Sequence, residues 1–128
     1  MLPWVEAYVG IPYLFGGSTR EGCDCWGLAR MILRERFGKE LPEFAHDSVD
    51  RRALAALVDA SLPLVNAVLI DAPEAGDIAL LRLLGEPCHV GLCVGDGYMI
   101  HSLRAHDSAL ERFASPRWAS RLEGFYRV

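Results

Sequence analysis

A thiol at the predicted start of a helix is the chemical feature of this sequence that most constrains its function. It lies in Cys23-Asp24-Cys25-Trp26-Gly27-Leu28, which follows a glycine-rich turn and opens an amphipathic run. Unpaired N–H groups and the positive end of the helix dipole favour an anion there and lower the pKa of a thiol. We therefore expect Cys25 to be a nucleophile. The alternative is that Cys25 is a small buried residue in the apolar stripe of the helix.

A nucleophilic cysteine needs a base, and His89 and His101 lie in strand-like segments further along the chain. Alternation puts His89 and Gly91 on one face of the first strand, and the glycine would leave open space for a substrate. Gly95-Asp96-Gly97 predicts a hairpin that pairs Gly91 with His101. The two histidines are then diagonal neighbours on one face. A lone strand histidine is more often structural, but two beside a helix-start cysteine favour catalysis.

These residues predict a division of labour for the hydrolysis of an amide. Cys25 attacks the carbonyl carbon, His89 takes the thiol proton and returns it to the leaving amine, and His101 holds the His89 ring. A backbone N–H at the helix start would supply part of an oxyanion hole, and the hydroxyl of Tyr13 would complete it.

The elements that must position these groups indicate an α+β fold with an antiparallel sheet, because helices come first and strands follow. Asp24 is the expected N-cap of the helix that carries Cys25, and Gly38 its stop; Ser48 is the expected N-cap of a later helix. The segment from Pro63 to Pro73 is open between strand and loop. We expect helices over residues 3–9, 25–37 and 48–61, and strands over 78–84, 89–94, 98–103 and 124–128.

Composition narrows the class of protein. The 128 residues, 52% of them hydrophobic, suit one globular domain over residues 1–128. A net charge of -4 gives no basic footprint for nucleic acid, and no apolar stretch is long enough for a membrane span. Residues 1–6 lack a signal-peptide pattern, so we expect synthesis in the cytoplasm.

The four cysteines are expected to be reduced thiols. The alternative, zinc ligation by Cys23, Cys25, Cys88, His89 and Cys93, lacks the paired spacing of structural zinc sites. No metal or other cofactor is expected.

The motifs together resemble those of the NlpC/p60 family of papain-like cysteine peptidases. They fall in the family's order and cover nearly the whole chain: Pro12-Tyr13-Leu14-Phe15-Gly16-Gly17, Asp24-Cys25-Trp26-Gly27-Leu28, Pro73-Glu74-Ala75-Gly76-Asp77-Ile78, His89-Val90-Gly91-Leu92 and Ile100-His101-Ser102.

The resemblance implies a papain-like fold and an endopeptidase that cuts peptidoglycan stem peptides, commonly at a D-glutamyl–diaminopimelate bond. It implies Cys25, His89 and His101 as the catalytic residues. Tyr13, Asp24 and Trp26 are the accompanying candidates for the oxyanion hole and substrate binding.

Trp26, the helix end from Arg30 to Arg36 and the closing Gly124-Phe125-Tyr126-Arg127 look like the phage-tail branch, similar to lambda-type tail assembly peptidases. The resemblance thus implies other tail proteins as partners and a virion tail that carries the enzyme to the bacterial cell wall.

Two alternatives remain at this point. The same fold could serve as a non-enzymatic plug or assembly piece of a tail tip. A cytosolic amidase or acyltransferase is disfavoured, because permuted relatives of that kind place the histidine before the cysteine. The segment from Glu40 to Pro73 matches no motif and is interpreted as a lid or a docking surface.

Overall fold

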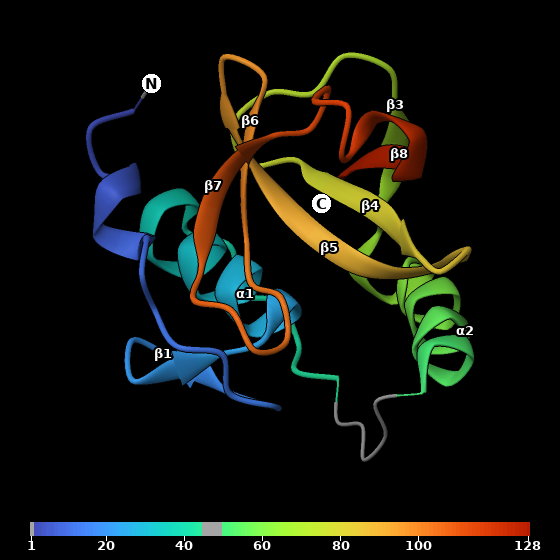
Figure 1. Cartoon of the computed structure of the whole chain (residues 1–128), viewed down its shortest axis with the longest axis horizontal. Coiled ribbons are helices and arrows are strands. Elements are labelled where there is room, and N and C mark those ends of the chain that lie inside the picture. Colours follow the sequence, from blue (N-terminus) through green and yellow to red (C-terminus); the bar gives the residue numbers. More distant parts are fainter. Residues whose placement is uncertain (1, 45–49) are drawn as a thin grey trace.

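The computed structural model describes residues 2–44 and 50–128, which form two helices, a six-stranded antiparallel sheet and a small hairpin (Figure 1). The strand order of the sheet is β3-β8-β4-β5-β6-β7. The strands are β3 (Val68–Ile70), β4 (Ile78–Leu83), β5 (Glu86–Gly95), β6 (Tyr98–His101), β7 (Ala109–Arg112) and β8 (Leu122–Arg127). Strands β1 (Ser18–Thr19) and β2 (Gly22–Cys23) make the hairpin, and short 3-10 turns span Val5–Tyr8, Pro63–Val65 and Ala119–Arg121. The expected α+β architecture is confirmed.

Helix α1 (Cys25–Phe37) begins and ends where its capping residues predict. The Asp24 side chain accepts a hydrogen bond from the N–H of Gly27, which satisfies one of the unpaired donors of the first turn. Gly38 adopts a left-handed conformation with φ of 65°, and its N–H bonds the carbonyl of Leu33. The thiol of Cys25 therefore stands in the first turn of the helix.

Helix α2 (Arg51–Ser61) confirms the second predicted long helix but not its cap. The side chain of Asp50 accepts hydrogen bonds from the N–H groups of Arg52 and Ala53, so Asp50 is the N-cap. Ser48, the expected cap, lies outside the described residues. No helix in residues 2–44 or 50–128 has the length and apolar character needed to cross a bilayer.

Each predicted strand is present, and two of the sheet's strands were not predicted. The unpredicted ones are β3, within the segment left open between strand and loop, and β7 at the other edge of the sheet. The hairpin turn carries Asp96 at a φ of 56° between two glycines that also have positive φ. Strand β5 pairs with β6 at Leu92–Ile100 and Cys93–Met99, the two pairs that precede the predicted Gly91–His101 pair in the same register, and the register shifts toward the turn, where Gly95 pairs with Tyr98. The predicted register is thus confirmed at Leu92–Ile100 and Cys93–Met99 and differs by one residue next to the turn.

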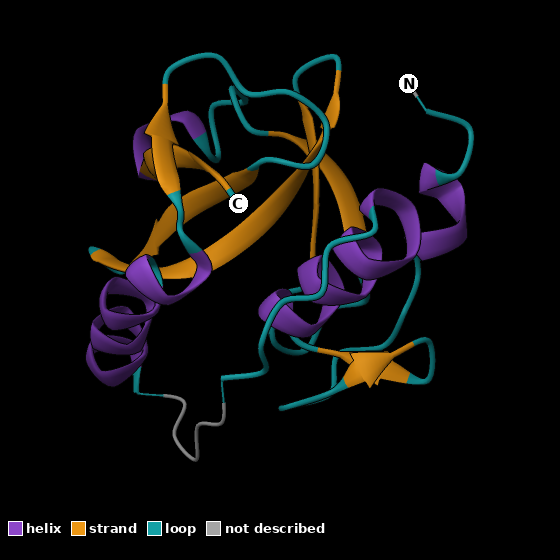
Figure 2. Cartoon of the chain, turned by 180° about the vertical axis from the view of Figure 1, so that it is seen from behind, coloured by secondary structure: helices purple, strands orange, loops and turns teal. Residues whose placement is uncertain are grey.

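The two faces of the sheet bury different cores. Helix α1 covers the face that carries Val90 and Leu92, and Figure 2 shows the helix in front of this face. The other face holds Cys93, Met99 and the fully buried Trp118. Because side chains alternate along β5, His89 belongs to this second face.

Candidate active site

Cys25 is held against both the glycine loop and strand β5. The carbonyl of Gly17 accepts the N–H of Asp24, and a Cβ at Gly27 would lie only 1.8 Å from that same oxygen. Only glycine fits there, so the Asp-Cys-Trp-Gly motif is explained by a close backbone approach. Backbone groups of Val90 and Trp26 hydrogen-bond the sulfur of Cys25. The thiol therefore lies against the residue that directly follows His89.

His89, His101 and Glu111 form a hydrogen-bonded chain across three neighbouring strands. The Nε2 atom of His89 is 2.8 Å from Nδ1 of His101, and Nε2 of His101 is 2.5 Å from a carboxylate oxygen of Glu111. Both histidines are buried. Within the described part of the chain, Nδ1 of His89 has no hydrogen-bond partner. That nitrogen is the one that the hydrogen-bonded chain leaves available for proton transfer.

Trp118 covers the two imidazole rings. Its ring stacks on His89 at 5.9 Å and meets His101 edge-on at 5.0 Å.

The expectation of open space above Gly91 is wrong, because a Cβ there would lie 2.8 Å from the sulfur of Met99. The face that carries the histidines is closed by packed side chains, and the substrate must approach from the Cys25 side.

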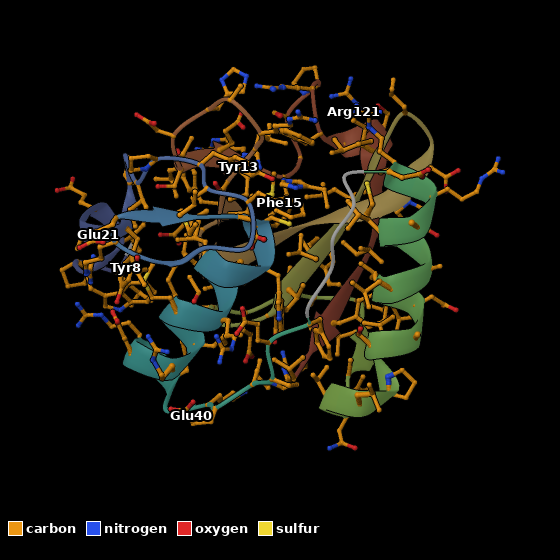
Figure 3. The ribbon with its side chains drawn as sticks, turned by 90° about the horizontal axis from the view of Figure 1, so that it is seen from below. Tyr8, Tyr13, Phe15, Glu21, Glu40 and Arg121 are labelled. Carbon is orange, nitrogen blue, oxygen red and sulfur yellow. The ribbon has the colours of Figure 1, made fainter. Side chains whose placement is uncertain are left out.

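A cavity of about 210 Å³ provides that approach. Cys25, His89 and Tyr13 all line it, and the half-buried Leu57 and Val58 of α2 form its far wall. Figure 3 shows Tyr13 and Phe15 in the loop above the N-terminal end of α1, with α2 across from them. Part of the segment that matches no motif therefore forms a wall of the candidate site. Among described residues, no hydrogen bond joins the sulfur of Cys25 to the His89 ring.

Burial determines the charge state of both reacting groups. It raises the pKa of the Cys25 thiol to about 12, even though the residue is partly exposed, and the backbone hydrogen bonds to the sulfur only partly oppose it. Burial also lowers the pKa of His89 to about 3, with further lowering by His101 and Arg117. The expected lowering of the thiol pKa is therefore wrong for the resting site, because desolvation outweighs the helix dipole. The site holds a neutral thiol beside a neutral imidazole.

The three accompanying candidates occupy different positions. Tyr13 lines the cavity, and burial raises the pKa of its hydroxyl, with contributions from Asp24 and Cys25. Asp24 also borders the cavity, but its carboxylate accepts the N–H groups of Gly27 and Gly16 at 2.7 and 3.0 Å and so supports the turn. Trp26 donates its indole N–H to a backbone carbonyl and stacks on Phe44 at the cavity wall.

Sequence reasoning missed three residues around the histidines. Glu111 lies on the unpredicted strand β7, Arg117 pairs with it at 3.3 Å, and Trp118 covers the rings. An acidic residue two positions into a short alternating run, Ala109-Leu110-Glu111, was the only signal. In the part of the chain that the structure describes, no group of three acidic, histidine or cysteine side chains is arranged to hold a metal ion.

Comparison of the sequence with known proteins identifies the family of this chain. A profile of the NlpC/P60 family matches residues 10–127. The chain is 27% identical over 119 residues to the murein DD-endopeptidase MepS/murein LD-carboxypeptidase of Escherichia coli K12, covering 93% of this chain and 56% of the relative. It is 34% identical over 98 residues to the gamma-D-glutamyl-L-lysine dipeptidyl-peptidase of Bacillus subtilis 168, covering 74% and 28% of the two chains. It therefore spans little more than half the length of the first relative.

Solved structures show the same fold. An NlpC/P60 family protein from Bacillus cereus ATCC 10987 superposes with a TM-score of 0.67 at 26% identity, covering 96% of this chain and 37% of that one. The NlpC/p60 domain of the peptidoglycan hydrolase SagA superposes with a TM-score of 0.62 at 21% identity, covering 96% and 91%. With a profile that matches almost every residue, these likenesses show that the chain belongs to the NlpC/P60 family.

Proposed function

We propose that this chain is a cysteine peptidase that hydrolyses amide bonds in the stem peptides of peptidoglycan. One observation carries the proposal: Cys25 and His89 line one cavity, and the His89 ring is held at Nε2 by His101, which leaves Nδ1 without a hydrogen-bond partner among the described residues. The substrate class is supported by the activities for which the relatives are named, a murein endopeptidase and a gamma-D-glutamyl-L-lysine dipeptidyl-peptidase.

In the proposed reaction, His89 acts as a general base during attack, since the resting thiol and imidazole are both neutral. The sulfur of Cys25 bonds to the carbonyl carbon while its proton moves to Nδ1 of His89. The C–N bond then breaks, and the amine leaves with that proton. Water attacks the resulting thioester, giving its proton to His89, and the thiol is restored when the C–S bond breaks.

The finer parts of the proposal are the bond and the biological setting. The D-glutamyl–diaminopimelate bond is supported by the relative that acts on a gamma-D-glutamyl linkage. A catalytic domain carried on a phage or prophage tail is supported by Trp26, the arginine-rich end of α1 and the closing residues of β8. The partners in that setting are other tail proteins.

The test is to incubate the purified chain with defined sacculi and identify the released muropeptides by mass spectrometry. We expect cleavage products with a new D-glutamyl end. Cys25→Ala should lower the rate by on the order of a thousandfold or more, because it removes the nucleophile. Cys93→Ala is the matched control, since this thiol is buried in the core on the Trp118 side.

Equal release by the parent and by Cys25→Ala would exclude Cys25 from the mechanism. No release by a folded parent, from sacculi or from synthetic stem peptides, would favour the non-enzymatic tail-tip role. The observation that favours this second function is the burial of Cys25, which keeps the resting thiol neutral.

A further inference from the structure

Glu111 lies one diagonal step beyond the two histidines on the same face of the sheet. Strand β7 pairs with β6 so that Ala109 is opposite His101 and Glu111 is opposite Met99. The carboxylate reaches back to His101 at 2.5 Å. His89, His101 and Glu111 thus follow one line across β5, β6 and β7.

The chemistry of these three groups fixes where each proton lies. Burial alone would raise the pKa of Glu111, but the hydrogen bond from His101, with Trp118 and Arg117, outweighs it and holds the pKa below its ordinary value. The ionised carboxylate can only accept, so Nε2 of His101 must carry a proton. Neutral His101 then accepts at Nδ1, and among the described residues its donor there is the Nε2–H of His89. The lone pair of His89 is left on Nδ1, the atom that must take the thiol proton.

We propose that Glu111 is a positioning residue that sets the tautomers of both histidines and so presents the basic nitrogen of His89 to Cys25. This inference rests on the proposed function and extends its catalytic chain by one member. The negative charge of Glu111 also stabilises the imidazolium that forms when His89 takes the proton, because that charge is shared along the hydrogen-bonded chain.

The surroundings hold Glu111 in place for this task. Arg117 binds its second carboxylate oxygen at 3.3 Å, and the guanidinium of Arg117 lies 4.9 Å over the ring of Trp118. The buried indole N–H of Trp118 lacks a full hydrogen bond among described residues but helps to lower the pKa of Glu111. Strand β7, Arg117 and Trp118 thus all contribute to holding the carboxylate beside His101.

The first experiment reads the tautomers directly and needs no activity. Long-range proton–nitrogen correlation spectra of histidine-labelled protein at neutral pH distinguish the two tautomers, with His89→Asn and His101→Asn used for assignment. We expect His89 and His101 of the parent to carry the proton on Nε2. A proton on Nδ1 of His89 in the parent would overturn the proposal, whether or not the protein cuts peptidoglycan.

The second experiment is a variant series on stem-peptide hydrolysis. Glu111→Gln keeps the shape but can donate as well as accept, so it should admit the wrong tautomer. We expect it to lower kcat by about 100-fold with KM little changed, as expected for a group that supports only the transition state. Glu111→Asp keeps an acceptor-only group and should recover part of the rate. Glu123→Gln is the control, because it breaks an ion pair with Arg82 on β4 and leaves the histidines alone.

These outcomes separate the inference from the proposed function. An inactive parent with the expected tautomers contradicts the peptidase function and leaves the role of Glu111 in setting the tautomers supported. An active parent whose Glu111→Gln variant keeps the parental kcat overturns the inference. So does a variant that loses activity while retaining the parental tautomers, since that would indicate a loss of packing.

Discussion

Burial acts on the two reacting groups in the same sense, since it disfavours the charged form of each. The resting site is then a thiol and an imidazole, and in the proposed reaction the proton moves only when a carbonyl carbon is in place. A cysteine that stays neutral between turnovers is a poor target for oxidants, because the thiolate is the reactive form. A neutral resting pair requires a well-aligned base, and alignment is the role that we propose for His101 and Glu111.

The lowered pKa of His89 makes stability depend on pH. The unfolded chain takes up a proton at His89 below about pH 6.5, whereas the folded chain does not until about pH 3. The contribution of His89 to the free energy of unfolding is therefore complete above pH 6.5. It falls on acidification by up to about 1.4 kcal/mol per pH unit. Burial lowers the pKa of His101 too, against the opposing bond from Glu111, so it adds in the same direction.

Urea unfolding at a series of pH values measures this slope. His89→Asn should reduce the pH dependence of the unfolding free energy between roughly pH 4 and pH 6 by the amount that corresponds to about one proton. His106→Asn, at an exposed position, is the control. A slope in His89→Asn equal to that of the parent would show that His89 titrates alike in the folded and unfolded chain.

The sequence predicts the pairing of the histidines but not their environment. Gly95-Asp96-Gly97 specifies the hairpin, and a two-residue side-chain period then places His89 and His101 together. The surroundings of Cys25, by contrast, are made by segments distant in sequence: the backbone of Val90 on β5 hydrogen-bonds the sulfur, and residues of α2 line the same cavity. The helix-start position alone therefore predicted the wrong direction for its pKa.

Among the elements, the sequence predicts the caps of α1 but not strand β7. Asp24 and Gly38 are local signals whose side-chain and backbone chemistry acts within a few residues. Strand β7 follows a seven-residue connection with no hairpin signature and pairs only along one edge. Glu111 was missed with it, because a residue cannot be placed before its strand is.

Gly27, in the first turn of α1, gives a prediction for stability that is opposite to the usual effect of replacing a helical glycine by alanine. In most helices, replacing glycine by alanine gains roughly 0.5–1 kcal/mol. Gly27→Ala should instead lower stability, because the new methyl group would lie 1.8 Å from the Gly17 carbonyl oxygen. The first turn must shift to relieve that contact, and Cys25 shifts with it, so the rate per folded molecule should fall as well.

Urea unfolding and stem-peptide hydrolysis together check the Gly27→Ala prediction. Gly38→Ala at the other end of the helix is the control: its left-handed backbone strains the alanine by about 1 kcal/mol, but the active cysteine is far from it. If Gly27→Ala were more stable than the parent, the close approach of the two backbones would be refuted.

The molecule as a whole encloses the site between parts that no single motif contains. The glycine loop and the start of α1 form one side, β5 and β6 carry His89 and His101, and α2 closes the cavity. Family motifs predict the first two of these parts. The α2 wall could not be predicted from them, since an amphipathic helix shows which face is apolar and not what that face covers.

A substitution on α2 tests whether this cavity is the substrate site. Leu57 lines it while the neighbouring Ala56 is exposed. Leu57→Trp should fill part of the 210 Å³ and raise KM for a stem peptide, lowering kcat/KM by about tenfold, which is about 1.4 kcal/mol. Ala56→Trp adds a larger side chain to the outer face of the same helix and should leave KM as in the parent. Thermal unfolding of both variants checks the fold; if KM in a folded Leu57→Trp protein matched the parent, the substrate would have to reach Cys25 by another side.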